Sequence, residues 1–149
     1  MKTIRENKPI RITAGVMTAA VMTVIFILSA QPSERSSELS MSLLARFFDG
    51  DVQLLLHSLV RKLAHMAEYA ALGFFSSLFA ATLSEKKLPS AAASFGFSVL
   101  YACSDEFHQT FVRGRAGQLT DVLIDSAGAA AGMTVLFLII NIISKKIRK

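Results

Sequence analysis

The sequence predicts an all-α fold, an integral membrane bundle of four transmembrane helices with short interfacial helices in the first extracytoplasmic loop. Apolar residues make up 52% of the 149-residue chain. Charged residues make up 18%, and they gather in short segments between long apolar stretches, as in bilayer proteins. The formal net charge of +5 comes largely from basic residues that border those stretches. That placement favours anchoring at an anionic membrane surface over binding to nucleic acid.

The first predicted span covers residues 12–30. Its apolar stretch begins after Arg11 and ends before Glu34, and it is longer than the apolar core of a signal peptide, which has about 7–15 residues. We therefore expect a retained helix. In the connection that follows, residues 31–60, two short segments with apolar residues at helical spacing flank Asp49-Gly50-Asp51. They predict two short helices that lie in the headgroup zone or cap the bundle, with a partly ordered loop as the alternative.

The second and third predicted spans, residues 62–84 and 88–108, contain too few uncharged residues to cross a bilayer alone. About 16 uncharged residues follow Glu68, and at 1.5 Å per residue they cover about 24 Å of a hydrocarbon core about 30 Å thick. The third apolar stretch has the same shortfall. We therefore expect these helices to carry Glu68 and Asp105 to the edge of the membrane or into it.

The fourth predicted span, residues 120–144, is long enough without help and begins near Asp125. Its glycines Gly128 and Gly132 form a G-x-x-x-G pattern, which permits close helix contact inside the bundle or in a dimer, with the bundle favoured. Lysine and arginine placement predicts that both termini are cytoplasmic. That orientation puts ten basic residues inside and six outside.

Under this topology, the unusual polar residues all lie at the extracytoplasmic end. Arg61, His65 and Glu68 are spaced i, i+4 and i+7, so they share one face of the second span. The third span ends with the same spacing, and the fourth begins with two aspartates one turn apart. Ionisable groups at membrane depth cost at least about 2.5–3.5 kcal/mol each, so they usually face one another or a wet cavity. We therefore expect a shared site that opens outward.

The site's residue types suit more than one chemistry. The arginines would bind phosphate or carboxylate groups in a bidentate manner. The candidate general acids and bases, which would equally suit carboxylate–histidine metal coordination, are His65, Glu68, Asp105 and His108. The candidate ligand-binding residues are Arg61, Lys62, Tyr69, Tyr101, Ser104, Glu106, Gln109, Arg113, Arg115, Asp121 and Asp125. A purely structural network of mutually neutralising charges is the alternative.

Three motifs in a fixed order resemble the VanZ-like family. They are R-K-L-A-H-M-A-E-Y-A-A-L-G at 61–73, Y-A-C-S-D-E-F-H-Q-T-F-V-R-G-R at 101–115 and D-V-L-I-D-S-A-G at 121–128. The segment F-I-L-S-A-Q-P at 26–32 is similar to the exit of that family's first helix. The resemblance implies a bacterial membrane protein. The family is named for a protein that confers resistance to the glycopeptide teicoplanin.

Two functions follow as hypotheses. The first is a cell-envelope protein of the bacterial cytoplasmic membrane whose outward-facing polar site binds an anionic envelope precursor or lipid-linked ligand and modulates glycopeptide susceptibility. The second is an intramembrane hydrolase or transferase that acts on a lipid-linked envelope substrate with acid–base or metal chemistry. No cofactor is expected, although the ligand types would accept a divalent metal. The expected partners are membrane lipid and the anionic ligand. The sequence leaves the enzymatic status and the oligomeric state open.

Overall fold

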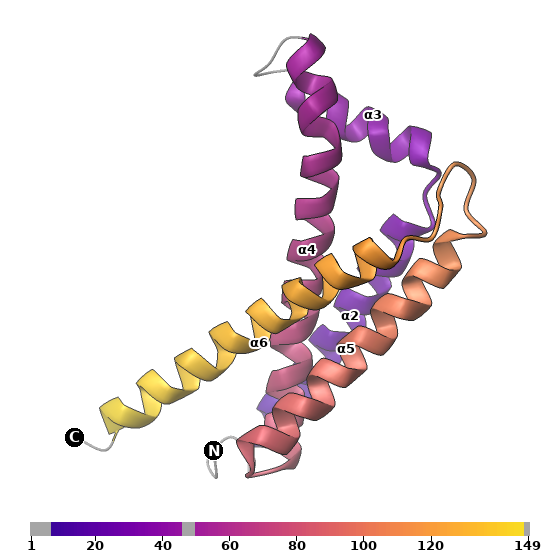
Figure 1. Cartoon of the computed structure of the whole chain (residues 1–149). Helices are drawn as coiled ribbons and strands as arrows, with labels where there is room; N and C mark the ends of the chain where they lie inside the picture. The colour runs from indigo at the N-terminus through magenta and orange to yellow at the C-terminus, as the bar shows by residue number, and fades with distance from the viewer. Residues whose placement is uncertain (1–6, 46–49, 148–149) are drawn as a thin grey trace.

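A computed structural model describes residues 7–45 and 50–147, and all regular elements in these two ranges are α-helices. Figure 1 shows their arrangement. In chain order they are α2 (Lys8–Ser29), α3 (Ser33–Leu44), α4 (Gly50–Leu83), α5 (Lys87–Gln109) and α6 (Leu119–Ile147). The all-α prediction is therefore confirmed for the described part of the chain. The expected segment around Arg46 to Asp49 lies outside the described residues.

Helix α2 begins with a side-chain cap. The Asn7 side chain accepts a hydrogen bond from the Ile10 backbone N–H at 3.1 Å, and a proline follows in the first turn. Proline suits this position because its missing N–H would have no partner in the helix. The helix ends at Ser29, one turn of chain before α3. This places Ser29 at the end of the bundle that carries the polar residues.

The first connection differs from the sequence-based expectation. We expected two separate short helices between the first two spans. The structure has a 12-residue helix, α3, and then the 34-residue helix α4. The second apolar segment, residues 52–59, is thus continuous with the second predicted span. Gly50 marks the start of a long helix, which begins well before the apolar region that could lie in a membrane.

Helices α4 and α6 cross each other (Figure 1), and their backbones are in close contact at glycine residues. A Cβ atom on Gly128 would collide with the Met66 carbonyl oxygen, and one on Gly132 would collide with the Ala70 carbonyl oxygen. Gly73 on α4 lies just as close to the backbone of α6. The G-x-x-x-G pattern therefore makes its close contact inside the bundle, because only glycine allows the two backbones to approach this far.

Helix α5 packs against α4 through small polar residues. The Ser77 and Ser94 hydroxyl groups lie 2.8 Å apart, and the Ser90 hydroxyl donates to the Ala80 carbonyl oxygen at 3.3 Å. Buried apolar residues from four helices form a core cluster beside the polar end. Its members are Ile25, Tyr69, Leu72, Ala102 and Val122.

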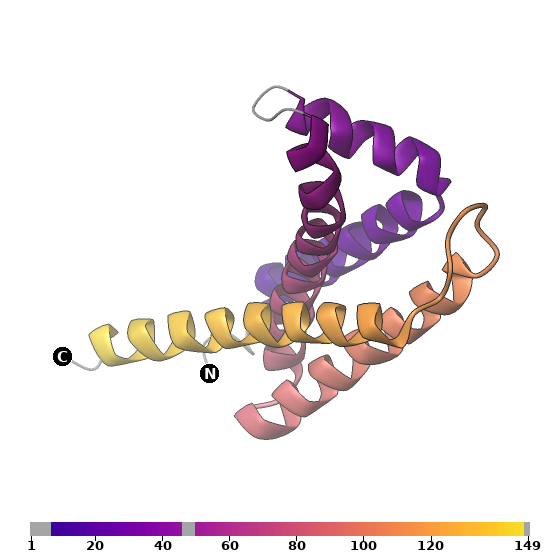
Figure 2. The ribbon, with the colours of Figure 1, turned by 45° about the horizontal axis from the view of Figure 1, so that its top comes forward.

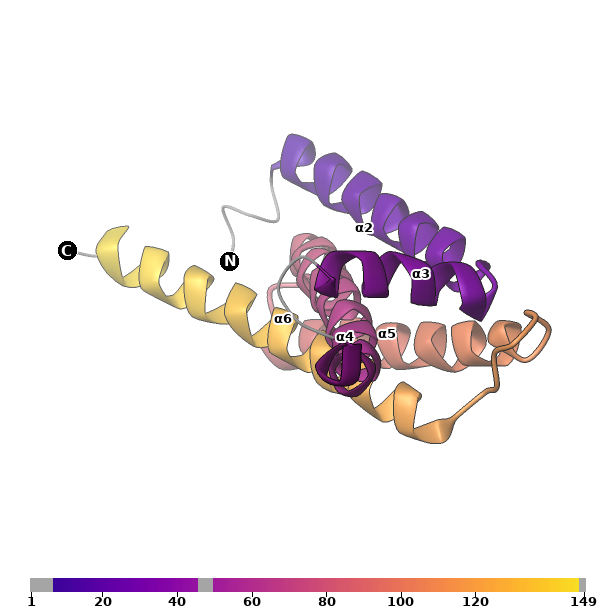
Figure 3. The same ribbon diagram turned by 90° about the horizontal axis from the view of Figure 1, so that it is seen from above.

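Three of the described helices are long and apolar enough to cross a membrane: Lys8–Ser29, Leu59–Leu83 and Leu119–Lys146. Helix α5 has 23 residues but a lower mean hydropathy, and it is not among them. Large apolar side chains such as Ile27, Leu100 and Ile142 are exposed on the outside of the bundle. Figures 2 and 3 show that the C-terminal part of α6 extends beyond the other helices.

Candidate functional site

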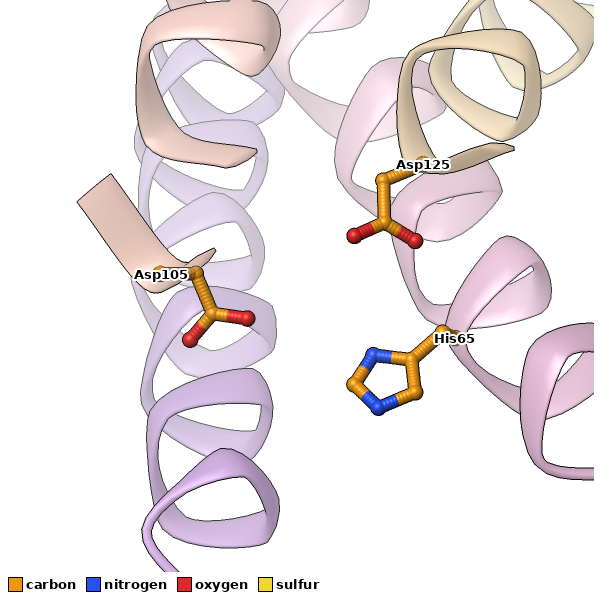
Figure 4. Close-up of side chains that lie close together, drawn as sticks. All are labelled: His65, Asp105 and Asp125. Carbon is orange, nitrogen blue, oxygen red and sulfur yellow. The ribbon is translucent and has the colours of Figure 1, made fainter. Parts of the chain in front are cut away.

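Three side chains from three helices meet at the polar end of the bundle. They are His65 on α4, Asp105 on α5 and Asp125 on α6, and each offers an atom that lies within 4.8 Å of the others. Figure 4 shows the Asp125 carboxylate and one ring nitrogen of His65 turned toward the space between the three groups. Asp105 and Asp125 are 4% and 2% exposed, so both carboxyl groups are almost fully removed from water.

Hydrogen bonds from α2 and α5 hold the Asp105 carboxylate. Its Oδ2 atom accepts a hydrogen bond from the Ser29 hydroxyl at 2.9 Å and another from the Gln109 side-chain amide at 3.1 Å. Gln109 also donates to the Ser29 oxygen at 3.4 Å. These two donors fix one carboxylate oxygen and leave the other available to a partner in the site.

Arg115 continues this network into the α5–α6 loop. Its guanidinium donates to Gln109 Oε1 at 3.1 Å, and it also donates to the backbone carbonyl oxygens of Leu28 at 3.1 Å and Gln31 at 3.0 Å. Carbonyl groups at a helix C-terminus lack partners within the helix, so Arg115 caps the end of α2. Burial, followed by the nearby charge of Arg61, lowers the pKa of Arg115, but a guanidinium remains protonated in proteins.

Several buried polar atoms in the site have no hydrogen-bond partner among the described residues. They are Asp125 Oδ1, His65 Nδ1, Glu68 Oε2 and the Tyr69 hydroxyl. His65 Nδ1 and Glu68 Oε2 lie 3.9 Å apart, beyond hydrogen-bond distance. Most buried polar groups in folded proteins are paired. The structure therefore gathers several buried polar atoms at one place whose partners would have to be water or a ligand.

A cavity of about 220 Å³ lies beside this group. Its lining combines cations, carboxylates and amides: Arg61, Lys62, His65, Glu106, Gln109, Gln118, Asp121, Ile124 and Asp125. Lys62 and Asp121 form an ion pair at 3.6 Å. The cavity therefore presents positive charge from α4 opposite carboxylates from α5 and α6.

Three other residues predicted for the site, Glu106, Tyr101 and Ser104, make hydrogen bonds within the bundle. Glu106 Oε1 accepts a hydrogen bond from the Gln118 backbone N–H at 2.6 Å, which ties the end of α5 to the start of α6. The Tyr101 hydroxyl donates to the Met22 carbonyl oxygen at 2.7 Å. The exposed Ser104 hydroxyl donates to the Tyr101 carbonyl oxygen at 3.0 Å.

His108 and Arg113 lie outside the cavity lining. The His108 ring packs on Phe26 of α2 with a centroid distance of 4.8 Å. The Arg113 side chain is exposed, and its carbonyl oxygen accepts a hydrogen bond from the Ser33 backbone N–H at 3.2 Å. The next residue, Gly114, has a φ of 72° and lies against the Ser33 side chain, so a glycine is required there.

Sequence reasoning missed Ser29, Gln31 and Gln118 as parts of this region. Ser29 is fully buried and bonded directly to Asp105. The signal in the sequence is the S-A-Q-P segment at the end of the first apolar stretch, which places a serine close to the predicted polar end. Gln31 and Gln118 take part through backbone atoms, to which the sequence gives no pointer.

The arrangement could support three kinds of chemistry. Arg61 and Lys62 could hold an anionic group at the cavity. His65, beside three carboxyl groups, could transfer a proton. One imidazole and two carboxylates could also coordinate a divalent metal, because these are the ligands of many mixed nitrogen–oxygen sites.

The family model described as VanZ/LLP1 matches residues 15–141, which is most of the chain. The matched range includes all three residues of the His65, Asp105 and Asp125 group. No curated protein and no solved structure matches this chain.

Proposed function

The chain belongs to the VanZ/LLP1 family, and we propose that it is a multi-pass protein of the bacterial cytoplasmic membrane whose polar cavity binds an anionic ligand of the cell envelope. Family membership and three apolar helices identify a membrane protein. The ligand class rests on one observation, the pair of cations Arg61 and Lys62 in the lining of a polar cavity at the end of the bundle.

The cavity's position supports a ligand that comes from the membrane surface. Arg61 and Lys62 lie just inside the start of the apolar region Leu59–Leu83. Phosphate groups of lipids and lipid-linked precursors occupy the same level of a bilayer. Lys62 is already paired with Asp121, so Arg61 is the cation that would contribute most to a new phosphate contact. The ligand we propose is therefore a phosphate-bearing lipid or lipid-linked precursor.

The test measures binding of a short-chain polyprenyl diphosphate to the full chain in lipid nanodiscs, with inorganic phosphate as a second probe. We expect Arg61→Ala to weaken binding of the diphosphate by about 10- to 100-fold, because a charge-assisted hydrogen bond contributes about 1.5–3 kcal/mol. Arg113→Ala is the matched control, since that side chain is exposed outside the cavity lining. Equal affinities for the two variants, or no binding by the unmodified chain, would contradict the proposal.

Glycopeptide susceptibility is the expected cellular readout. The family's name refers to teicoplanin resistance, and we propose that a filled cavity modulates the access of glycopeptides to the cell surface. Cells expressing Arg61→Ala should then lose any shift in teicoplanin susceptibility that the unmodified chain causes. Cells expressing Arg113→Ala to the same level should keep it.

An intramembrane hydrolase or transferase is the second candidate. Its support is the position of His65, which would act as the base. Its Nδ1 atom lies 3.9 Å from Glu68 Oε2 and close to two buried aspartates, and one of these carboxylates would orient the ring. The binding experiment separates the two candidates. The enzyme hypothesis predicts that the unmodified chain removes the diphosphate group from the probe. It also predicts that His65→Gln abolishes this reaction while the variant still binds the probe.

A further inference from the structure

The His65, Asp105 and Asp125 group has nearly the dimensions of a metal site. Ligand atoms that surround a transition-metal ion at about 2.0–2.3 Å lie about 3–4.5 Å from one another. The three candidate atoms here lie within 4.8 Å of one another. Small side-chain rotations would therefore bring all three to coordinating distance.

An unpartnered buried atom points into the same space. Asp125 is 2% exposed, and its Oδ1 atom has no hydrogen-bond partner among the described residues. Figure 4 shows the Asp125 carboxylate facing His65 and Asp105. His65 Nδ1 is unpartnered as well. A buried carboxylate oxygen without a donor is unfavourable, and a cation between Asp125, Asp105 and His65 would satisfy it.

The residues around Asp105 resemble the outer layer of a metal site. Metal-binding carboxylates are usually held by further hydrogen bonds that set their orientation. Asp105 accepts two such bonds on Oδ2, from Ser29 and Gln109, and Gln109 is itself held by Arg115. This arrangement fixes one oxygen and orients the rest of the carboxylate.

We propose that His65, Asp105 and Asp125 bind one divalent cation of the transition-metal class, such as Mn²⁺, Fe²⁺ or Zn²⁺. Two carboxylates balance the charge of the ion, and the imidazole nitrogen favours these metals over Mg²⁺ or Ca²⁺, which prefer oxygen ligands alone. His65 and Asp125 line the cavity, so the remaining coordination positions would face it. The metal site does not depend on the anion binding proposed above.

Metal binding is tested on the full chain purified in detergent, stripped with EDTA and then exposed to Zn²⁺ or Mn²⁺ alone. Elemental analysis should find about one ion per chain, and calorimetry should give the affinity. Asp125→Asn and His65→Gln should each weaken binding by at least about 10-fold, since even loss of a residue behind a ligand costs about 10- to 100-fold. These two substitutions keep the side-chain size and remove the ligand character.

Two matched controls locate the site. Asp121→Asn changes a carboxylate of the same cavity, and His108→Gln changes a partly buried histidine that packs on Phe26 instead. Both variants should bind Zn²⁺ and Mn²⁺ as tightly as the unmodified chain. If Asp121→Asn loses the metal as completely as Asp125→Asn, the ion lies elsewhere in the cavity and the proposal is overturned.

A measurement on the unmodified chain covers the case in which the variants fail to fold. X-ray absorption of the Zn²⁺-loaded protein should show nitrogen and oxygen neighbours that include one imidazole. Bound metal should also raise the melting temperature of the chain, and EDTA should reverse the rise. No metal binding tighter than millimolar, or coordination without an imidazole, would overturn the proposal.

Discussion

At the scale of single residues, neighbouring arginines in one turn have opposite surroundings. Arg115 is partly buried and donates three hydrogen bonds that join the end of α2 to Gln109. Arg113, two residues earlier, has an exposed side chain. The sequence makes the two residues look equivalent. Only the structure shows that Arg115 caps a helix and supports Asp105 through Gln109.

We predict that Arg115→Lys destabilises the fold by about 2–3 kcal/mol, because hydrogen bonds to charged groups contribute about 1.5–3 kcal/mol. An ammonium group cannot reproduce the fork of the guanidinium, so at least one of the three acceptors, Gln109 Oε1 and the carbonyl oxygens of Leu28 and Gln31, loses the donor that Arg115 supplies. Denaturant unfolding of the chain in mixed micelles would measure the change. The control is Arg113→Lys, which should stay within about 0.5 kcal/mol of the unmodified chain. Equal effects of the two substitutions would show that the Arg115 network adds nothing to stability.

The position of His108 shows the limit of predicting side-chain partners from residue spacing alone. Asp105 and His108 are three residues apart, which suggested one shared face of the third span. Three residues turn a helix by about 300°, so the two side chains diverge by about 60°. In a bundle this is enough to place the Asp105 carboxylate beside His65, Asp125 and Ser29, while the His108 ring packs on Phe26 of α2. The spacing predicted one shared face for the two residues, and the structure gives them different partners.

At the scale of helices, the α4–α6 crossing brings the site together. Gly128 and Gly132 allow α6 to touch the backbone of α4 directly. Asp125 lies one turn before Gly128, and His65 lies one residue before Met66, which Gly128 contacts. The close crossing therefore sets the distance between two members of the candidate site. A wider crossing would move Asp125 away from His65.

Gly132→Ala should destabilise the protein by about 1–3 kcal/mol, because an added methyl group would collide with the Ala70 carbonyl oxygen and force the helices apart. The matched control is Gly96→Ala on α5, where a methyl group would meet no atom within 4 Å. That substitution should be neutral or stabilising by up to about 1 kcal/mol, since alanine favours helix more than glycine does. The same unfolding experiment compares both variants. A neutral Gly132→Ala would mean that the crossing is loose in solution.

The sequence predicted the helices better than their boundaries. Apolar stretches of the right length gave the type and approximate place of the four longest helices. The start of α4 was missed, because Asp49-Gly50-Asp51 is typical of a break between two helices. Gly50 begins a single helix of 34 residues instead. Local composition indicates where a helix can end, whereas packing against the rest of the chain decides how far it continues.

At the scale of the whole molecule, the bundle is apolar outside and polar at one end inside. Large apolar side chains are exposed along α2, α5 and α6, while Asp105, Glu106 and Asp125 are buried. This is the arrangement expected of a membrane bundle whose ionisable groups face its interior. Both described ends of the chain lie away from the α5–α6 loop (Figure 1). Among the four longest described helices, α5 is the one that is not apolar enough to be identified as a membrane span.

The direction of the helices argues that α5 also crosses. Helix α6 crosses α4 obliquely, and both helices run from the end of the bundle that carries the α5–α6 loop toward the opposite end (Figure 1). If both helices cross a bilayer in that direction, the chain between them must cross back. Helix α5 is the long element of that connection, with 23 residues or about 34 Å of length. Its buried serines lower its mean hydropathy, but they face α4 and not lipid.

We therefore predict four crossings with both termini on the cytoplasmic side. An alkaline phosphatase reporter, which is active only outside the cytoplasm, should be active when fused within the 110–117 loop and inactive when fused after Lys86 or at the C-terminus. The basic residues near Lys87 and Lys145 support the same orientation, since lysine and arginine favour the inner side. An active C-terminal fusion together with an inactive fusion in the loop would reverse the orientation. Equal activity after Lys86 and within the loop would mean that both ends of α5 lie on the same side of the membrane. That outcome would contradict the prediction of four crossings.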